Sequence, residues 1–289
     1  MWRYSAWMRC LIATLLSACL LSVHGAPAAG VDAVWQRVGT GITQGISGVA
    51  AAPAGGWVVV RDNKSAGQNR VALLSADGVI TPVSWPGSAP QDLEAIDAVP
   101  NQAGRYVVVT SGGAGRIIAV TGTTLSVVRS FTLPTGRNQN EGFALTPLGR
   151  TTVAVWGNRG ASAKPGRLYA ATFKVGTGVF GAVAKRPVTV PYPTTNVRHI
   201  SDIKVLAGRI VVSSASDAGN NGPFDSALYD VGRVVLDSGR ARLTPSMPAS
   251  LGTYPGHKVE GIACNGAQGI LGTDDENLGS SVTPAAFCG

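Results

Sequence analysis

A five-residue pattern returns five times along the chain and constrains its fold more than any other feature. The copies are ISGVA at 46–50, LEAID at 93–97, NEGFA at 140–144, ISDIK at 200–204 and VEGIA at 259–263. A turn and a run rich in Val, Ile and Thr follow each copy, and such runs indicate β-strands. We expect each repeat unit to be a small antiparallel meander, and a succession of such units is typical of β-propellers.

The spacing of the copies predicts the number of blades. Their second residues are Ser47, Glu94, Glu141, Ser201 and Glu260, which gives steps of 47, 47, 60 and 59 residues, and only 29 residues follow Glu260. The segment AVWQRVG near the N-terminus would complete the last unit by adding its outer strand. We therefore expect an all-β fold, a five-bladed propeller over residues 29–289 whose N-terminal strand closes the last blade. A six-bladed ring, with an additional blade inside 144–198, is the alternative.

Composition excludes several other classes of protein. The chain of 289 residues has 38 Gly and 17 Pro, which leaves little room for long helices. The net charge is +8, yet the basic residues are scattered singly and no aromatic-interleaved basic tract occurs. Nucleic-acid binding is therefore not expected.

Residues 1–28 have the features of a secretory signal peptide. Arg3 and Arg9 precede an apolar stretch too short to span a bilayer comfortably, and Ala26 and Ala28 form an A-x-A site. Cleavage after Ala28, or nearby at Gly25, would release a periplasmic or secreted protein with no transmembrane segment, which we expect to be a monomer. The sequence Leu16–Cys19 also resembles a lipobox, so a lipoprotein anchored at Cys19 is the alternative.

Signal removal would leave two cysteines, Cys264 and Cys288. Because an exported protein meets an oxidising compartment, we predict a disulfide between them. It would stabilise the fold by about 3 kcal/mol in the loop-entropy model.

Ring closure would gather polar side chains at one mouth of the central channel. In a propeller the first strand of each blade lies next to the axis, so the starts of these strands meet the ends of the second strands at one face. Residues of both sets would collect there: Glu94, Glu141, Glu260, Ser47, Ser201, Asp202, His199, Arg198, Lys258, Asp62, Asn63, Lys64, Asn158, Arg159, Asp217, Asp274, Asp275 and Glu276. Crowded carboxylates have raised pKa values or attract a hard cation such as Ca²⁺.

The motifs together resemble the phytase-like, or "esterase-like activity of phytase", propeller family of secreted bacterial proteins. The likeness runs from about Ile46 to Asn277 and is carried by DLE at 92–94, NEG at 140–142, SDI at 201–203, KVEG at 258–261 and DD at 274–275. It implies export, a propeller and hydrolysis of a phosphoester or a carboxylester by rim carboxylates. The sequence departs from the family's acidic ends of the second and fourth b strands, where it has VTSGG at 109–113 and VSSAS at 212–216.

We assign candidate roles to the polar residues of this mouth. The candidates are Glu260, Glu94 and Glu141 for catalysis, Asp274, Asp275, Asp202 and Asp62 for a metal, and Arg61, Lys64, Arg159, Arg198, His199 and Lys258 for substrate. A structural role competes with the catalytic one, because carboxylates repeated in three blades could instead accept backbone N–H groups of the next blade. His199 and His257 both precede first strands, but no G-x-S-x-G elbow supports a Ser-His-Asp triad. The G-x-G-x-x-G match at 176–181 is interpreted as a turn, since no helix follows.

Three functional hypotheses follow. The leading one is a calcium-assisted hydrolase of a small phosphorylated or ester substrate at the carboxylate-lined mouth. The second is a propeller that binds a ligand or calcium without turnover, and the third is a scaffold for another envelope protein.

Overall fold

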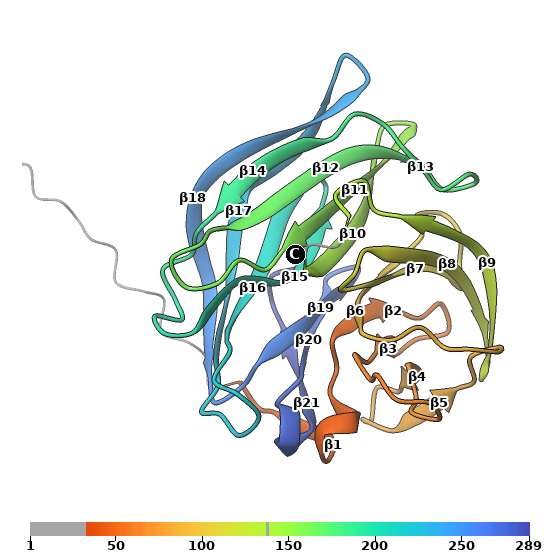
Figure 1. The fold of residues 1–289 in the computed structure, drawn as a ribbon, viewed down its shortest axis with the longest axis vertical. Coiled ribbons are helices and arrows are strands. Elements are labelled where there is room, and N and C mark those ends of the chain that lie inside the picture. Colours follow the sequence, from red (N-terminus) through yellow and green to blue (C-terminus); the bar gives the residue numbers. More distant parts are fainter. Residues whose placement is uncertain (1–32, 137–138) are drawn as a thin grey trace, which may run out of the picture.

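The computed structural model describes residues 33–136 and 139–289, and within them it is a ring of five antiparallel sheets. Figure 1 shows these sheets arranged around a centre, which confirms the predicted five-bladed propeller. The predicted signal peptide, its cleavage site and Cys19 lie outside the described residues.

Each blade is a meander with its first strand innermost. Blade 1 contains β2 (Gly48–Ala51), β3 (Trp57–Val60), β4 (Val71–Leu74) and β5 (Ile80–Val83); blade 2 contains β6 (Leu93–Ala98), β7 (Arg105–Thr110), β8 (Ala114–Thr121) and β9 (Thr124–Thr132). Blade 3 contains β10 (Asn140–Leu148), β11 (Thr151–Asn158) and β12 (Gly166–Lys174), with β13 (Val179–Phe180) and β14 (Ala184–Val188) both pairing with β12. Blade 4 contains β15 (Val197–Leu206), β16 (Arg209–Ser216), β17 (Asp225–Asp237) and β18 (Arg240–Pro255). Blade 5 contains β19 (Val259–Asn265), β20 (Gln268–Thr273), β21 (Ser280–Ala285) and β1 (Gln36–Gly39), and the short 3₁₀ turns η1 (Ile42–Gln44) and η2 (Glu276–Leu278) lie at its junction with blade 1.

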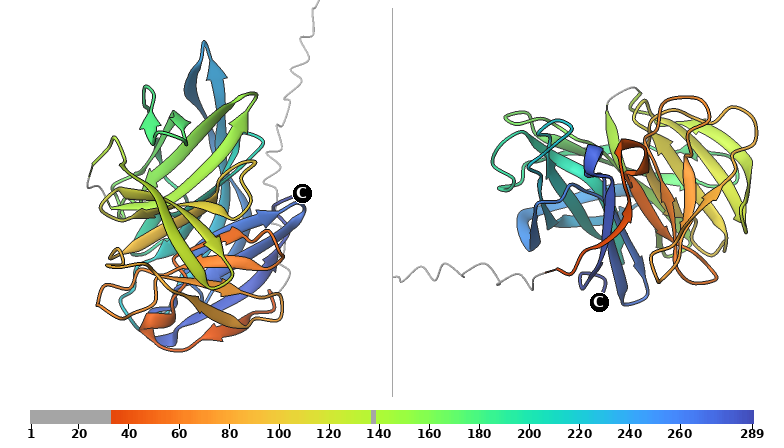
Figure 2. Two further views of the ribbon diagram at one scale, coloured as in Figure 1. Left: turned by 90° about the vertical axis from the view of Figure 1, so that its right-hand side faces the viewer. Right: turned by 90° about the horizontal axis from the view of Figure 1, so that it is seen from below.

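The N-terminal strand closes the ring, as predicted. β1 pairs antiparallel with β21, with Gln36 opposite Val282. The Trp35 ring stacks on His257 at a centroid distance of 4.1 Å, and the Thr283 hydroxyl donates to the Val34 carbonyl. Figure 2 shows this segment lying against the last strands of the chain.

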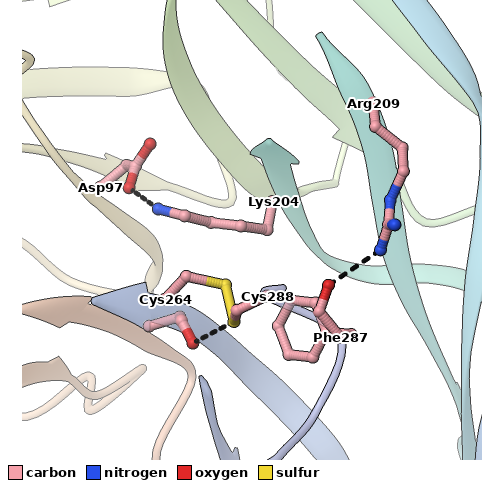
Figure 3. Close-up of a disulfide and its surroundings, with 7 residues drawn as sticks. Asp97, Lys204, Arg209, Cys264, Phe287 and Cys288 are labelled. Atoms are coloured by element: carbon pink, nitrogen blue, oxygen red, sulfur yellow. Dashed lines mark hydrogen bonds and ion pairs between the residues drawn. A yellow bond between two sulfur atoms is a disulfide. The ribbon is translucent and has the colours of Figure 1, made fainter. Parts of the chain in front are cut away.

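The Cys264–Cys288 disulfide is present, as predicted (Figure 3). It joins the end of β19 to the C-terminal tail, with a Cα–Cα distance of 5.7 Å. Blade 5 is therefore fastened both by pairing with the N-terminal strand and by a covalent bond to the tail.

The longer steps of the repeat do not hold a sixth blade. The additional residues of blade 3 form the outer segments β13 and β14, and those of blade 4 extend the hairpin β17–β18 beyond its partner β16.

The first strands of adjacent blades approach closely because three copies of the repeat have glycine as their third residue, at Gly48, Gly142 and Gly261. A Cβ on Gly142 would lie 2.3 Å from the Ile203 backbone nitrogen of the next blade. Gly261 faces Val49 in the same way, and Gly48 faces Ala95. Glycine at these positions is thus required by packing, and the apolar core fills the spaces between successive sheets.

Candidate functional site at the mouth of the channel

The second residue of each repeat lies at the start of the innermost strand, and a β-bulge accompanies it in four blades. Register shifts occur between Leu93 and Ala95, between Asn140 and Phe143, between Arg198 and Asp202, and between Val259 and Gly261. A bulge re-aims a side chain from its strand. The ends of the second strands bring Asp62, Arg159, Asp217 and Asp274 to the same face, and Arg159 and Asp217 of that set are linked by ion pairs to Glu141 and Arg198 of the first strands.

Ion pairs occupy the part of the mouth over blades 3 to 5. Arg198 binds Glu260 at 2.8 Å and Asp217 at 3.1 Å. Lys258 binds Glu260 at 3.3 Å and also contacts Glu276. These cations are therefore shared among carboxylates of the protein itself.

Arg159 is held more loosely between two carboxylates of the same region. Its Nη1 lies 3.8 Å from Glu141 Oε1 and 4.0 Å from Asp217 Oδ2. Glu141 consequently has a counter-ion only at the outer limit of an ion pair, although its side chain is buried.

The part of the mouth over blades 1 and 2 has a different balance of charge. Lys64 pairs with Asp62 at 3.3 Å and with Asp92 at 3.0 Å. Glu94 is half-buried and forms no hydrogen bond or ion pair with the residues that the structure describes. It is the carboxyl group of the ring that is available to a ligand.

The glutamates of the ring differ in their tendency to hold a proton. Burial, together with the charges of Glu141 and Glu260, raises the pKa of Glu94 well above its ordinary value. Burial raises the pKa of Glu141 to about 8, against the opposing effect of Arg198. Burial and the neighbouring Glu260 also raise the pKa of Asp274. Protonated carboxyl groups are thus present at this mouth near neutral pH.

The paired cations stay charged. Burial alone would lower the pKa values of Arg198 and Lys258, but the Glu260 carboxylate reverses this and raises both. For Asp217, the Arg198 charge outweighs burial and lowers its pKa. The mouth therefore combines a charged network with neutral carboxyl groups beside it.

The four residues predicted to bind a metal have other partners. Asp275 accepts from the Lys258 backbone N–H and the Thr273 hydroxyl and contacts His257, whereas both Asp202 oxygens accept backbone N–H groups. Asp274 accepts the Glu276 N–H and is wedged against Gly45, where a Cβ would lie 2.2 Å from its Oδ1.

These donors do not converge on one point. Asp62 is engaged by Lys64, and across residues 33–136 and 139–289 no three His, Cys, Asp or Glu side chains are placed to hold one ion. The donor set does not fit a calcium centre, so we derive no chemical step through a metal.

Two predicted substrate-binding residues are tied into the scaffold. Both ring nitrogens of His199 are engaged, since Nδ1 accepts the Val190 N–H and Nε2 lies 2.8 Å from the Ser162 carbonyl. Arg61 is buried and its Nη1 donates to the Thr43 carbonyl and to Gln44. His199 is therefore not free to bind a ligand, whereas the Nε and Nη2 atoms of Arg61 are buried without a hydrogen-bond partner among the described residues.

Two aspartates hold adjacent blades together by accepting backbone N–H groups. Asp97 of β6 accepts from Leu145 in blade 3, and Asp202 of β15 accepts from Ile262 in blade 5. This is the structural role that the sequence suggested for the glutamates.

Asp97 also forms a salt bridge with Lys204 that crosses the channel from blade 2 to blade 4 (Figure 3). The pair was not predicted, although the repeat contains a signal for it. The other three copies have Ala50, Ala144 and Ala263 at the same position. Two opposite charges among three alanines indicate a pair that meets inside the ring.

Comparison with known proteins gives no family assignment. No protein-family model and no curated protein matches the sequence. An auxiliary nutrient binding protein from Bacteroides ovatus is similar in structure, with 14% identity and a TM-score of 0.40 over 83% of this chain, which spans 59% of that protein. A carbohydrate-active enzyme of family AA12 from Trichoderma reesei has 9% identity and a TM-score of 0.46, with 89% and 97% of the two chains covered. The resemblance to phytase-like proteins is not confirmed by these comparisons.

Proposed function

We propose that the channel mouth is a hydrolytic site for a small, uncharged carboxylic ester. The observation that carries the proposal is the contrast within the ring of glutamates. Glu260 is bound to two cations, whereas Glu94 has no counter-ion and Glu141 has only a distant one. Burial raises the pKa of both Glu94 and Glu141, and the charge of Glu141 adds to the rise for Glu94.

The ion pairs favour a carboxylic ester over a phosphoester. A phosphoryl group needs unpaired cations to balance its charge. Lys64, Arg159, Arg198 and Lys258 are all within 4.0 Å of carboxylates of the protein. Arg61 has no carboxylate partner among the described residues, but it is buried, and burial lowers its pKa. A neutral ester requires no such compensation and can accept a hydrogen bond from a protonated carboxyl group.

Above about pH 8 Glu141 is ionised, whereas burial and the Glu141 charge favour a proton on Glu94, so the two carboxyl groups can supply a base and an acid. The ionised member takes a proton from water, and the resulting hydroxide forms a C–O bond to the ester carbonyl. The protonated member donates its proton to the alkoxide as the ester C–O bond breaks, giving an alcohol and a carboxylic acid. One carboxyl group is then protonated and the other ionised, as at the start.

Secretion is part of the same proposal and rests on the N-terminal sequence. Among the described residues, no helix has the length and apolar character that crossing a bilayer requires. We infer an extracytoplasmic location, reached through the predicted signal peptide.

Product release by the purified mature protein tests the proposal. We expect hydrolysis of 4-nitrophenyl acetate but not of 4-nitrophenyl phosphate, measured from pH 5 to 9 with and without added Ca²⁺. Because general acid–base catalysis contributes roughly 10²–10⁴-fold, Glu94→Gln and Glu141→Gln should each lower kcat/KM by at least about 100-fold. Asp77→Asn, on the exposed β4–β5 turn, serves as the control that retains activity.

Absence of ester hydrolysis by folded protein across this pH range would contradict the proposal. Calorimetric binding of an ester without turnover would support the ligand-binding alternative. Release of phosphate that depends on Ca²⁺ would support the phosphoester hypothesis instead of ester hydrolysis.

A further inference from the structure

The acidic and basic residues of the chain occupy different regions of the molecule. Most acids lie at the mouth, in the channel or between the innermost strands: Asp62, Asp92, Glu94, Asp97, Glu141, Asp202, Asp217, Glu260, Asp274, Asp275 and Glu276. The full sequence is nevertheless basic, with a net charge of +8, of which Arg3 and Arg9 of the predicted signal peptide contribute two. Its outer surface therefore carries a large excess of positive charge.

This excess is concentrated on the outer strands of blades 3 and 4, which we call the outer wall and define as β12–β14 and β17–β18. The exposed cations of the wall are Arg167, Lys174, Lys185, Arg186, Arg233, Arg240 and Arg242. Of these, only Arg242 has a carboxylate partner within the described chain, Asp237 at 2.7 Å. The remaining cations are open to an external anion.

The outer wall also exposes apolar side chains. Val179, Val183, Val235, Met247 and Leu251 all lie on or between its strands. Met247 is 89% exposed, at a point where three residues, Ser246 to Pro248, bulge between the Gly232–Pro245 and Asp230–Ala249 pairs. Single exposed apolar residues need no explanation, but this group shares one wall with unpaired cations.

The two blades form a continuous wall. β18 contacts both β12 and β14, and Arg186 and Arg233 flank a narrow cleft between the blades whose lining includes Leu168 and Leu243. Figure 1 shows β14, β12, β17 and β18 side by side, with the β17–β18 hairpin projecting furthest from the ring.

We propose that the outer wall binds the surface of a membrane that contains anionic lipids. Basic side chains attract the headgroups, and exposed aliphatic side chains enter the boundary below them. A soluble polyanion would use the charges but not the apolar groups. A protein that adds a strand to β18 is disfavoured because Pro245 and Pro248 interrupt that edge. The wall lies at the blade edges farthest from the axis, so membrane contact leaves the mouth open, and this inference is independent of ester hydrolysis.

Flotation of the mature protein with lipid vesicles tests the proposal. We expect the protein to float with vesicles of phosphatidylglycerol and phosphatidylcholine at 50 mM NaCl, and not with pure phosphatidylcholine. Since each basic residue near an anionic surface contributes roughly fivefold to binding, Lys185→Glu/Arg186→Glu should weaken the partition coefficient by at least about tenfold. Arg105→Glu/Arg150→Glu, which changes two exposed arginines at the turns between the first and second strands of blades 2 and 3, is the matched control and should have a smaller effect.

Met247→Ser separates a lipid surface from a soluble polyanion. Its side chain packs against little of the protein, so the variant should fold normally, as circular dichroism can verify. We expect it to weaken vesicle binding by about threefold at 500 mM NaCl and to leave binding to soluble polyphosphate unchanged. Equal flotation with neutral and anionic vesicles, no flotation at low salt, or vesicle binding that is unaffected by both wall variants would each overturn the proposal.

Discussion

At the scale of single residues, glutamates at equivalent positions of the repeat differ in their ion pairs and in their pKa values because their neighbours differ. Glu94, Glu141 and Glu260 occupy the same place in their blades, but only Glu260 is bound closely by Arg198 and Lys258. The repeat pattern predicts that these glutamates share one mouth. It does not predict their protonation, because the counter-ions come from other loops and their reach depends on side-chain conformation.

The pKa of Glu141 gives a prediction for stability. Between about pH 4.5 and 8 the folded protein retains a proton that the unfolded chain has released, so this group lowers the free energy of unfolding as pH rises. Glu141→Gln abolishes that titration. We expect the variant to exceed the parent in stability by about 1–2 kcal/mol at pH 8 and by little at pH 4.5. Thermal denaturation at both pH values measures this, with the exposed Asp77→Asn as a control that gains nothing. An equal gain at both pH values would contradict the assignment.

At the scale of strands, the sequence predicts the position of a strand where its pattern recurs in every blade. It does not predict the length of the strands in which the blades differ. The copies at 46–50 to 259–263 locate the first strands, and the following Val-rich runs locate the second. The lengths of β13, β14 and the β17–β18 hairpin could not be predicted, because outer strands face solvent on one edge and tolerate insertions. This is why steps of 60 and 59 residues left a six-bladed ring open as an alternative.

The contact between first strands gives a prediction at this scale. Gly142→Ala would place a methyl group 2.3 Å from the Ile203 nitrogen, and backbone cannot move away cheaply. We expect a loss of about 2–3 kcal/mol, within the range for overpacked cores. Gly176→Ala, in a turn with no atom within 4 Å of the added Cβ, is the matched control and should be neutral. Urea denaturation measures the free energy of unfolding of both variants. Equal values for Gly142→Ala and Gly176→Ala would contradict the prediction and show that the first strands can move apart.

At the scale of the whole molecule, stability depends on joining the two ends of the chain. β1 covers the edge of β21, and Trp35 and Thr283 extend the contact beyond that pairing. The cysteine pair and the closure were predictable because both follow from segments near the termini. The Asp97–Lys204 salt bridge was missed although these two charges replace alanine at one position of the repeat, because the pattern alone does not say which blades face each other across the channel.

Removal of residues 33–39 should open the ring. We expect the melting temperature of the shortened mature protein to fall by more than 10 °C, and the exposed edge of β21 to promote aggregation. Replacing both Cys264 and Cys288 by Ser should cost about 3 kcal/mol while leaving the ring paired. Differential scanning calorimetry compares the two. A truncated protein as stable as the parent would mean that β1 does not close the fold.

The salt bridge between Asp97 and Lys204 lies on the axis below the glutamates and joins opposite sides of the lumen (Figure 3). This contact ties together two blades that are not neighbours in the ring. It therefore restrains directly how far the ring can widen at that level, and any passage from one face of the ring to the other would have to go around these two side chains.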